Sequence, residues 1–516
     1  MTRPPQAVKI HAADNVAVAV GALAAGSGVV VEGECVVLRE DIPAGHKISL
    51  RTLEPGEPVV KYGFPIGEVT APIAPGAWVH THNLKTRLEG LVEYRYEPFD
   101  RTRKSERETR NGRSDFRVPS SAFFRGYRRR TGRVGTRNEV WILNTVGCVN
   151  HAAERIAREG AERFAGRGGG GPIDGVYGFS HPYGCGQLGD DLRNTQRALA
   201  GLMRHPNAGG VLVLGLGCEN NQMDGLLRLA GDVDRARLRF FNSQEVTDEV
   251  DAGLEAVAQL AAAMERDARV ECPASDLVLG HKCGGSDGLS GITANPLVGR
   301  IADRLTALGG GVILTEVPEI FGAEQLLMRR AVDEAVFRDI VALVNDFKEY
   351  FLRHGQPIYE NPSPGNVAGG LTTLEEKSLG AVQKGGRTAV TRVLRYGEPA
   401  APGGLSLLEA PGNDGVSSTA LVASGATLLL FTTGRGTPLG FPVPTLKISS
   451  NTAIAEKKPH WIDLNAGALL DGTATMDQLE NDLFALVLDV ASGRELANNE
   501  KHGYREIAIW KEGVTL

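Results

Sequence analysis

The sequence predicts a multidomain α/β protein in which a small N-terminal all-β module precedes two α/β domains. Length is the first reason, because 516 residues are expected to form roughly two to four domains. The second reason is a change of pattern, from short strands separated by turns to an alternation of strand, loop and helix. The expected parts are a β module over 1–88, a charged linker over 89–125, a middle α/β domain over 126–270 and a C-terminal α/β domain over 271–516.

The N-terminal part contains short apolar runs with glycine or proline between them. Val16–Val20, Val29–Val31 and Cys35–Leu38 are examples, and this punctuation is typical of an all-β module. After it, Arg101–Arg117 holds seven basic and three acidic side chains without apolar periodicity. A solvated linker is the expected structure, with an arm that contacts a neighbouring subunit as the alternative.

The middle part alternates strands and helices. The strand Val140–Leu143 precedes a helical run over Ala152–Phe164, and Gly175–Phe179 precedes another over Asp191–Met203. A third strand is expected at Gly210–Leu214. The alternation predicts a parallel sheet, with ligands at the carboxyl ends of its strands.

The C-terminal part repeats this alternation. It starts with the strand Leu277–Gly280, continues with a helix over Pro296–Leu308 and a strand over Gly311–Glu316, and then has a long amphipathic stretch over Glu324–Arg353. We therefore expect a second parallel α/β domain.

Composition excludes several classes of protein. Apolar residues make up 42% and charged residues 23%, as in soluble globular proteins. The net charge of −6 gives no reason to expect a nucleic-acid partner. Apolar runs are far shorter than the ~18 residues of a membrane helix, and Met1–Gln6 does not resemble a secretory signal. Six scattered cysteines suit a reducing compartment, so a cytoplasmic protein without a membrane partner is expected.

Four cysteines follow expected strands in glycine-rich or polar segments: Cys148, Cys185, Cys218 and Cys283. Thiolates suit iron or an iron–sulfur cluster. The successive gaps of 37, 33 and 65 residues exclude a Cys-x-x-Cys loop, so ligands would have to converge from separate loops. The alternative is that each cysteine is a small apolar residue.

Histidines and glutamates provide further candidates. His80 and His82 lie on one face of an extended segment and could chelate a divalent metal, or form a surface pair. His181 is a candidate general acid or base because its neutral form is available near pH 7, or it hydrogen-bonds in a turn. Glu316 ends a strand near Glu319 and is a candidate catalytic carboxylate, the alternative being an exposed, solvated pair.

Polar loops suggest substrate contacts. Ser286, Asp287 and Asn295 lie in or near a glycine-rich loop, where they could bind hydroxyl groups or form turns. Arg435 and Lys447 place cations near small residues. A guanidinium suits a carboxylate, and a structural salt bridge is the alternative.

Many segments together resemble the altronate and galactarate dehydratase family of sugar-acid hydro-lyases. The resemblance covers nearly the whole chain and includes His11–Ala17, Gly45–Lys47, Val146–Asn150, Tyr183–Cys185, Gly215–Gln222, Cys283–Gly291, Asn361–Asn366, Phe431–Pro438 and Glu512–Leu516. Within the family the altronate branch is the nearer match, on Lys61–Gly63, His80–Asn83 and Glu316–Gln325.

The resemblance implies an N-terminal module of the SAF type, a middle domain and a larger C-terminal domain. It implies a hydro-lyase of hexuronate (galacturonate) catabolism that removes the C2 proton and the C3 hydroxyl of D-altronate to give 2-dehydro-3-deoxy-D-gluconate. Galactarate dehydration, sulfolactate cleavage and a non-catalytic sugar-acid or iron sensor are the alternatives.

The resemblance also implies Fe2+ or a similar divalent metal such as Mn2+, with an iron–sulfur cluster left open. Whether the cysteines or the histidines hold it, and whether the chain forms a homo-oligomer, stay open. His181 or Glu316 would transfer the proton, Arg435 and Lys447 would bind the substrate carboxylate, and His46 would reach the site if the module covers it.

Overall fold

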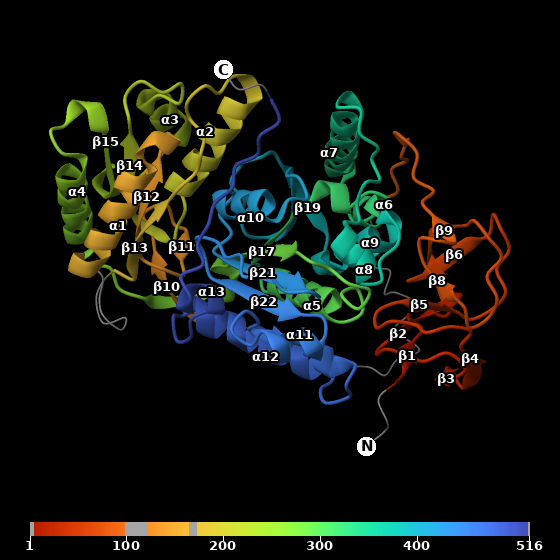
Figure 1. Ribbon diagram of the computed structural model, residues 1–516. Coiled ribbons are helices and arrows are strands. Elements are labelled where there is room, and N and C mark those ends of the chain that lie inside the picture. The colour runs from red at the N-terminus through yellow and green to blue at the C-terminus, as the bar shows by residue number, and fades with distance from the viewer. Residues whose placement is uncertain (1–4, 99–121, 165–172, 514–516) are drawn as a thin grey trace.

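The computed structural model describes residues 5–98, 122–164 and 173–513. Figure 1 shows the N-terminal module at one end, the middle domain at the other and the C-terminal domain between them. The expected linker over Arg101–Arg117 lies outside the described residues. Over the described ranges, no helix combines the length and the apolar character needed to cross a membrane.

The N-terminal module contains only antiparallel strand pairs among its described residues, which confirms the expected all-β module. Its sheets have the orders β1-β2-β5-β8, β3-β4 and β6-β7-β9. Val29, Ile42 and Ile48 lie in its core. The strands are β1 (Ala7–Val8), β2 (Val16–Ala19), β3 (Gly28–Val31), β4 (Glu34–Val37), β5 (Lys47–Ser49), β6 (Pro58–Lys61), β7 (Phe64–Val69), β8 (Trp78–Val79) and β9 (Leu84–Lys85).

The middle domain has the expected parallel sheet, in the order β13-β12-β14-β15. Val140 and Ile142 of β12 pack toward α1 and α4, whereas Trp141 and Leu143 pack toward α2 and α3. Burial on both faces explains its nearly continuous apolar strands. The elements are β12 (Glu139–Asn144), α1 (Asn150–Phe164), β13 (Gly175–Phe179), α2 (Gly189–Met203), β14 (Ala208–Gly215), α3 (Met223–Ala230), β15 (Leu238–Asn242) and α4 (Glu249–Met264).

A small antiparallel sheet lies where the chain enters and leaves the middle domain. Strand β10 (Phe123–Arg128) pairs with β11 (Val134–Gly135) on one side and with β16 (Val270–Pro273) on the other. The residues between β10 and β11 form a basic hairpin over 129–133.

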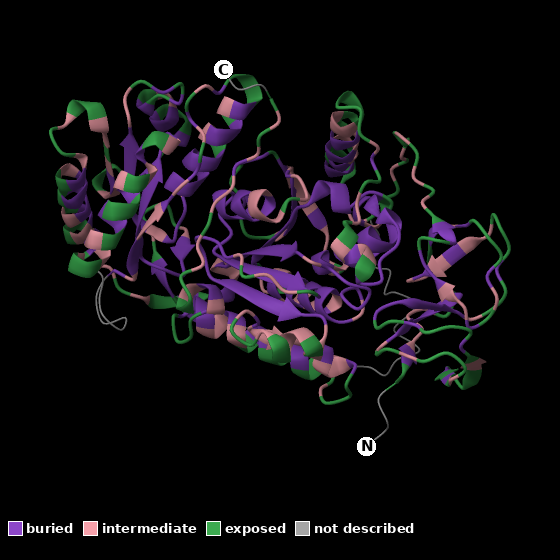
Figure 2. Cartoon of the chain, in the orientation of Figure 1, coloured by how far each residue is buried: buried purple, intermediate pink, exposed green. Residues whose placement is uncertain are grey.

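The C-terminal domain is built on a parallel sheet of seven strands in the order β19-β20-β18-β17-β21-β22-β23. Figure 2 shows its central strands buried along their length, in agreement with the fully buried patterns of β17, β21 and β22. The strands are β17 (Val278–Cys283), β18 (Gly311–Leu314), β19 (Val390–Leu394), β20 (Gly404–Leu408), β21 (Leu428–Thr433), β22 (Thr445–Ser449) and β23 (Leu464–Asn465).

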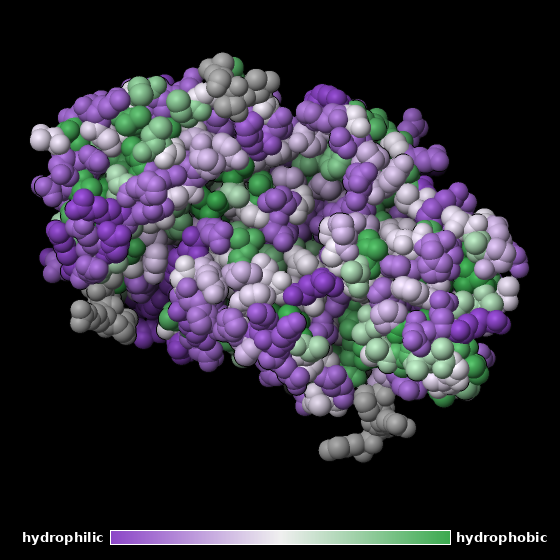
Figure 3. All heavy atoms as spheres, in the orientation of Figure 1, coloured by the Kyte–Doolittle hydropathy of each residue, from purple (hydrophilic) through white to green (hydrophobic). Residues whose placement is uncertain are grey.

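Helices surround this sheet (Figure 1), and the face of the molecule seen in Figure 3 has polar and apolar side chains interspersed. The amphipathic stretch expected over Glu324–Arg353 is divided into two helices, because Ala331 bridges to Val390 and the Asp333 side chain caps a new helix. The helices are α5 (Ala294–Ala307), α6 (Glu324–Met328), α7 (Glu334–Arg353), α8 (Pro364–Ala368), α9 (Leu374–Ala381), α10 (Asp414–Ala423), α11 (Thr452–Lys457), α12 (Met476–Ala491) and α13 (Asn498–Lys501).

A buried ion cluster attaches the N-terminal module to the C-terminal domain. Glu376 of α9 accepts hydrogen bonds from Lys47 and Lys61 of the module, each at 2.8 Å, and all three side chains are fully buried. Burial alone would raise the pKa of Glu376, but the two ammonium groups outweigh burial and lower it. Burial lowers the pKa of Lys47 to about 8, since two cations share one carboxylate.

Contacts between glycines also hold the backbone of the module close to that of the C-terminal domain. The carbonyl oxygen of Gly45 lies 1.9 Å from where a Cβ of Gly288 would be and 2.3 Å from that of Gly370. Any larger residue at Gly288 or Gly370 would push the module away, so glycine is needed at both positions.

We predict that Glu376→Gln weakens the docking of the module, because it leaves two buried ammonium groups without a carboxylate. The expected loss is about 3–5 kcal/mol in the free energy of unfolding, measured by denaturant unfolding together with limited proteolysis of the module. Exposed Glu349→Gln on α7 is the control. Replacing Lys47, Lys61 and Glu376 together by Met should restore most of the stability, and a Glu376→Gln effect no larger than the control would contradict the prediction.

Candidate active site

The loops after the central strands of the seven-stranded sheet meet at one edge. Strands β18, β17, β21 and β22 are neighbours and parallel, so their carboxyl ends lie together. In sheets of this kind ligands bind at that edge. Cys283 ends β17, Glu316 follows β18, Arg435 follows β21 and Ser450 follows β22.

Cys283, Glu316 and Glu319 form a buried group able to hold a metal. The Cys283 Sγ lies 3.3 Å from Oε2 of Glu319 and 3.6 Å from Oε2 of Glu316. One ligand atom from each residue lies within 4.8 Å of the other two, and the described chain has no second group of this kind. One sulfur and two carboxylates suit a divalent transition metal, so the donor set fits such an ion.

The backbone at Glu316 is strained. Its φ of 66° and ψ of 54° place it in the left-handed region, which costs a non-glycine residue on the order of 1–3 kcal/mol. The carboxylate returns to β17, where Oε2 accepts a hydrogen bond of 3.1 Å from the Cys283 N–H. The short 3-10 helix Val317–Glu319 then brings Glu319 to the same place. Strain of this kind persists only where the surrounding structure holds it, so the fold fixes the Glu316 carboxylate.

Three buried lysines contact the two glutamates. Lys384 Nζ lies 2.7 Å from Oε2 of Glu316, and Lys282 donates to the other oxygen. Lys377 Nζ lies 2.8 Å from Oε1 of Glu319. A metal at the Cys283 group would therefore share its carboxylates with ammonium groups.

The lysines set the charges of this group. Burial alone would raise the pKa of Glu319, but the ammonium groups of Lys377, Lys282 and Lys384 outweigh burial and lower it. Burial, reinforced by the Glu316 carboxylate, raises the pKa of the Cys283 thiol to about 12. The carboxylate of Glu319 is thus ionised near neutral pH, while the thiol keeps its proton until a cation replaces it.

Sequence reasoning missed these lysines as site residues. Lys282 directly precedes Cys283, a predicted site residue, and this position in the sequence could have identified it. Lys377 and Lys384 lie in and just after helix α9, where their spacing to Glu319 and Glu316 follows from the fold alone.

A cavity of about 330 Å3 lies between the N-terminal module and the C-terminal domain. Val20 and Ala44 line it from the module. The C-terminal domain contributes Asp287, Leu289, Ala368, Gly369, Gly434, Arg435, Asn451, Thr452, Ala453, Gly467, Leu470 and Asp471. Among the predicted substrate residues, Arg435 and Asp287 therefore face the cavity.

The side chains of Asp287 and Asn295 are engaged with the protein itself, whereas Ser286 is buried beside Asp287 and contributes its carbonyl. The Asp287 carboxylate accepts hydrogen bonds from Ser450 at 2.8 Å and from Asn451 at 2.9 Å. Asn295 is buried between the Gly380 carbonyl and the Thr432 hydroxyl, at 3.0 and 2.6 Å. These contacts hold the loops that shape the cavity.

Asn366 connects the cavity to the Cys283 group. Its Nδ2 donates to the carbonyl of Ser286 at 2.8 Å, directly before Asp287. Its Oδ1 accepts from Lys377 at 3.1 Å, and Lys377 binds Glu319. The two parts of the site therefore share one hydrogen-bond network.

Lys447 does not line this cavity. Its Nζ lies 6.0 Å from the centre of the Tyr504 ring, and burial lowers its pKa to about 8. Of the two cations predicted to bind the substrate carboxylate, Arg435 therefore lines the cavity and Lys447 does not.

The histidines of the module form an aromatic cluster. Trp78 stacks on His80 with ring centres 5.1 Å apart, and His46 lies 4.9 Å from His80. Trp78 Nε1 donates to Nδ1 of His46, which assigns the imidazole proton to Nε2, 3.4 Å from the carbonyl of Ala368. Burial lowers the pKa of His46 and takes that of His80 to about 4. His80 and His82 belong to no metal-binding group in the described chain.

His181 and three of the predicted cysteines belong to the middle domain. His181 is buried, and its Nε2 lies 2.8 Å from the carbonyl of Asn144 at the end of β12. Cys148, Cys185 and Cys218 are exposed. The described structure does not bring these three sulfurs into one group with the fourth cysteine, which lies in the other parallel sheet.

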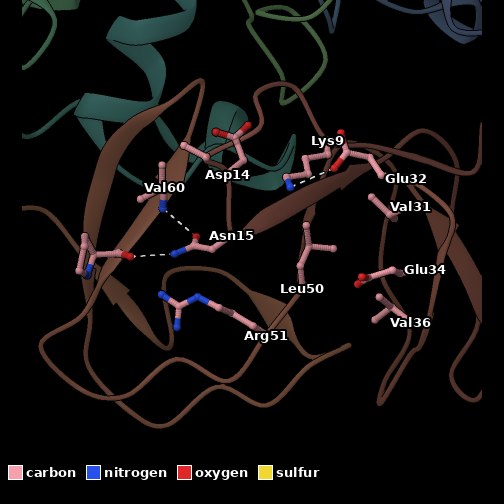
Figure 4. A pocket seen from close by; sticks show the side chains of 12 residues that line it. Lys9, Asp14, Asn15, Val31, Glu32, Glu34, Val36, Leu50, Arg51 and Val60 are labelled. Carbon is pink, nitrogen blue, oxygen red and sulfur yellow. Dashed lines mark hydrogen bonds and ion pairs between the residues drawn. The ribbon is translucent and has the colours of Figure 1, made fainter.

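The N-terminal module has a cavity of its own, of about 380 Å3 (Figure 4). Lys9 and Glu32 pair across it at 3.0 Å, and Asn15 bonds to the backbone of Pro58 and Val60. Because these polar groups satisfy one another, the cavity between the domains is the better candidate for the reaction.

Comparison with known proteins yields matches along the whole chain. Residues 5–87 match the altronate/galactarate dehydratase SAF domain, 126–265 the D-galactarate dehydratase/altronate hydrolase second domain, and 274–515 the D-galactarate/altronate dehydratase C-terminal domain. Altronate dehydratase of Escherichia coli K12 is 51% identical over 99% of this chain and 100% of its own. That of Bacillus subtilis 168 is 49% identical over 99% of both chains. Galactarate dehydratase (L-threo-forming) of E. coli K12 is 33% identical over 98% of this chain and 96% of its own.

We predict that Cys283→Ser removes the sulfur-to-metal absorption of the cobalt(II)-loaded protein. Cobalt(II) reports a bound thiolate by a charge-transfer band in the near ultraviolet, and Cys283 is the thiol beside Glu316 and Glu319. Cys148→Ser, Cys185→Ser and Cys218→Ser are the matched controls and should keep the band. Loss of the band in a control, with retention in Cys283→Ser, would show that the metal is elsewhere.

Proposed function

The chain belongs to the D-galactarate/altronate dehydratase family, and from this premise we propose that it removes water from D-altronate to give 2-dehydro-3-deoxy-D-gluconate. The observation that carries the proposal is the identity of 51% and 49% with two altronate dehydratases over essentially the full length. The identity with the galactarate enzyme is 33%, so altronate is favoured over galactarate as substrate.

The reaction builds negative charge on the substrate when the C2 proton is removed, and the site must stabilise that charge. A base removes the C2 proton, and the electron pair of that C–H bond becomes the C2=C3 double bond as the C3–O bond breaks. The proton and the hydroxide together make one water, and the enol product becomes the 2-oxo acid by moving a proton to C3. Removing a proton next to an ionised carboxylate builds a second negative charge, so nearby cations lower the barrier.

Arg435 is our proposed anchor for the substrate carboxylate. It faces the cavity between the two domains, whose volume of about 330 Å3 suits a six-carbon acid. Its guanidinium has no carboxylate partner among the described residues. A fork of two N–H groups binds a carboxylate bidentately, which would fix which end of the substrate faces the Cys283 group.

Cys283 and Glu319 are the proposed ligands of the metal, which we take to be Fe2+, with Mn2+ as a substitute, and Glu316 lies beside them. When bound, this ion would supply a Lewis acid for the charge that develops next to the substrate carboxylate. Glu319 brings the ionised carboxylate that the ion needs.

Glu316 is the proposed base at C2, because its strained backbone holds the carboxylate at the sheet edge. The carboxylates of Asp414 and Glu316 outweigh burial and raise the pKa of Lys282. Cys283, Glu316 and Glu319 likewise outweigh burial and raise the pKa of Lys384. Both lysines thus remain cationic and can offset the charge of the enolate.

His46 acts as a donor in this proposal. Its Nδ1 accepts from Trp78, so its Nε2–H is directed at the carbonyl of Ala368, a residue of the cavity wall, 3.4 Å away. In this proposal a substrate hydroxyl takes the place of that long contact, so His46 orients the hydroxyl while proton removal falls to Glu316.

We expect Arg435→Gln to lower kcat/KM roughly 30- to 100-fold, the equivalent of a lost charge-assisted hydrogen bond of about 2–3 kcal/mol. The loss should fall mainly on KM, since the carboxylate is bound in both ground and transition states. Initial rates of 2-oxo acid formation measure it. Lys447→Gln is the control and should leave KM near the parent value; a larger effect there would reverse the assignment.

The function itself is tested by turnover of D-altronate, galactarate and sulfolactate after anaerobic loading with iron. We expect altronate to give the highest kcat/KM and the product to be the 2-oxo acid. Faster turnover of either competitor would reassign the substrate. Tight binding of altronate without turnover by the loaded protein would instead indicate a sensor.

A further inference from the structure

A second cavity between domains lies at the amino-terminal edge of the middle sheet, opposite the loops that carry Cys148, Cys185 and Cys218. Its volume is about 350 Å3. The starts of β14 and β15, the end of α2 and the hairpin between β10 and β11 form its walls, and Pro399 adds a contact from the C-terminal domain. Because ligands of parallel sheets bind at the carboxyl edge, this cavity is separate from the candidate active site.

Its lining is strongly basic. Six arginines and three aspartates line it. The arginines are Arg128, Arg129, Arg130, Arg133, Arg204 and Arg237, and the aspartates are Asp232, Asp234 and Asp267.

The aspartates are already paired with some of these arginines. Arg237 forms two bonds of 2.6 Å with Asp267, which Arg129 also approaches at 3.4 Å. Arg130 lies 3.3 Å from Asp232. The carboxylates in the lining are therefore used by the arginines around them.

Arg133 and Arg204 have no carboxylate partner among the described residues. Arg133 Nη2 donates to the carbonyl of Gly425 at 3.2 Å. Arg204 donates to carbonyls at the end of α3, at 3.2 and 3.4 Å, and to that of Gly397 at 3.4 Å. A guanidinium has five N–H groups, so each retains donors for another acceptor.

Burial makes these two charges costly. It lowers the pKa of Arg204, and burial together with the charge of Arg204 lowers that of Arg133. An anion bound between them would supply the missing countercharge, and guanidinium groups bind phosphate and carboxylate through their planar fork.

The floor of the cavity is apolar. Met203, Val211, Val233 and Leu238 are buried residues that line it. An inorganic anion would leave this surface uncovered, whereas an organic anion would cover it with its carbon skeleton.

We propose that this arginine-lined cavity is a binding site for a small organic phosphate, with the phosphoryl group at Arg133 and Arg204 and an apolar body on the floor of Met203, Val211, Val233 and Leu238. A phosphoryl group is favoured over a carboxylate because it carries up to two charges and three acceptor oxygens. The site does not depend on the reaction proposed above. Since the hairpin, the middle sheet and Pro399 all border it, a bound phosphate would bridge the middle and C-terminal domains.

Calorimetric titration of the full-length protein at low salt tests the proposal with three probes: inorganic phosphate, phenyl phosphate and benzoate. Phenyl phosphate should bind at least tenfold more tightly than inorganic phosphate, because its ring covers the apolar floor, and more tightly than benzoate. It should also raise the Tm, as a ligand of the native state must. Equal affinities for the two phosphates would overturn the organic part of the proposal, and tighter binding of benzoate would overturn the phosphoryl part.

Variants locate the site. Arg133→Gln and Arg204→Gln should each weaken phenyl phosphate binding at least tenfold and remove its effect on the Tm. Thr131→Glu adds a negative charge at the exposed rim of the cavity without replacing Arg133 or Arg204, which are partly buried, so it should weaken binding even if an arginine variant folds poorly. Exposed Arg158→Gln on α1 is the control.

Two results would contradict the proposal. The first is no detectable binding of phenyl phosphate by the parent protein. The second is binding that Thr131→Glu and both arginine variants leave unchanged relative to Arg158→Gln, since the arginines would then serve only to hold the carbonyls of neighbouring segments.

Discussion

Helix α9 is the element on which both the domain arrangement and the candidate active site depend. Every residue of it is buried. Glu376 accepts from Lys47 and Lys61 of the N-terminal module, while the next residue, Lys377, binds Glu319 of the Cys283 group. Adjacent side chains of one turn thus fix the module on one side and a carboxylate of the site on the other. The docking of the module on the C-terminal domain, which encloses the cavity between them, depends on this double attachment, because moving the helix would disturb both ion clusters.

Charge balance explains why the Cys283 group can be buried. Three ammonium groups form ion pairs with three carboxylates, and the thiol is neutral. The ammonium groups are those of Lys282, Lys377 and Lys384, and the carboxylates are those of Glu316, Glu319 and Asp414. Buried charges are tolerated when they are paired and hydrogen-bonded. A divalent cation entering this cluster must displace the thiol proton and compete with ammonium groups, so metal binding and the protonation of Cys283 are linked. The strained backbone of Glu316 holds the carboxylate where that competition takes place.

The order of elements was predictable because each α/β strand is apolar along its length and each helix has its own periodicity. The all-β module, the parallel middle sheet and the parallel C-terminal sheet follow the predicted sequence segments. The division of Glu324–Arg353 into two helices was missed, since the bridge between Ala331 and Val390 joins residues far apart in the chain. The order of the strands within each sheet could not be predicted from the apolar pattern either, because it is set by packing between segments that are distant in the sequence.

By itself, the sequence determined the class of fold, the family and the segments that border the site, because apolar periodicity and long motifs are properties of consecutive residues. It identified Cys283 and Glu316 as candidates, with Glu319 beside them. Only the tertiary structure separated Cys283 from Cys148, Cys185 and Cys218 and joined it to lysines that follow about a hundred residues later. Ligand geometry and counterions arise from contacts between distant loops, and in a buried site those contacts decide which charges can coexist.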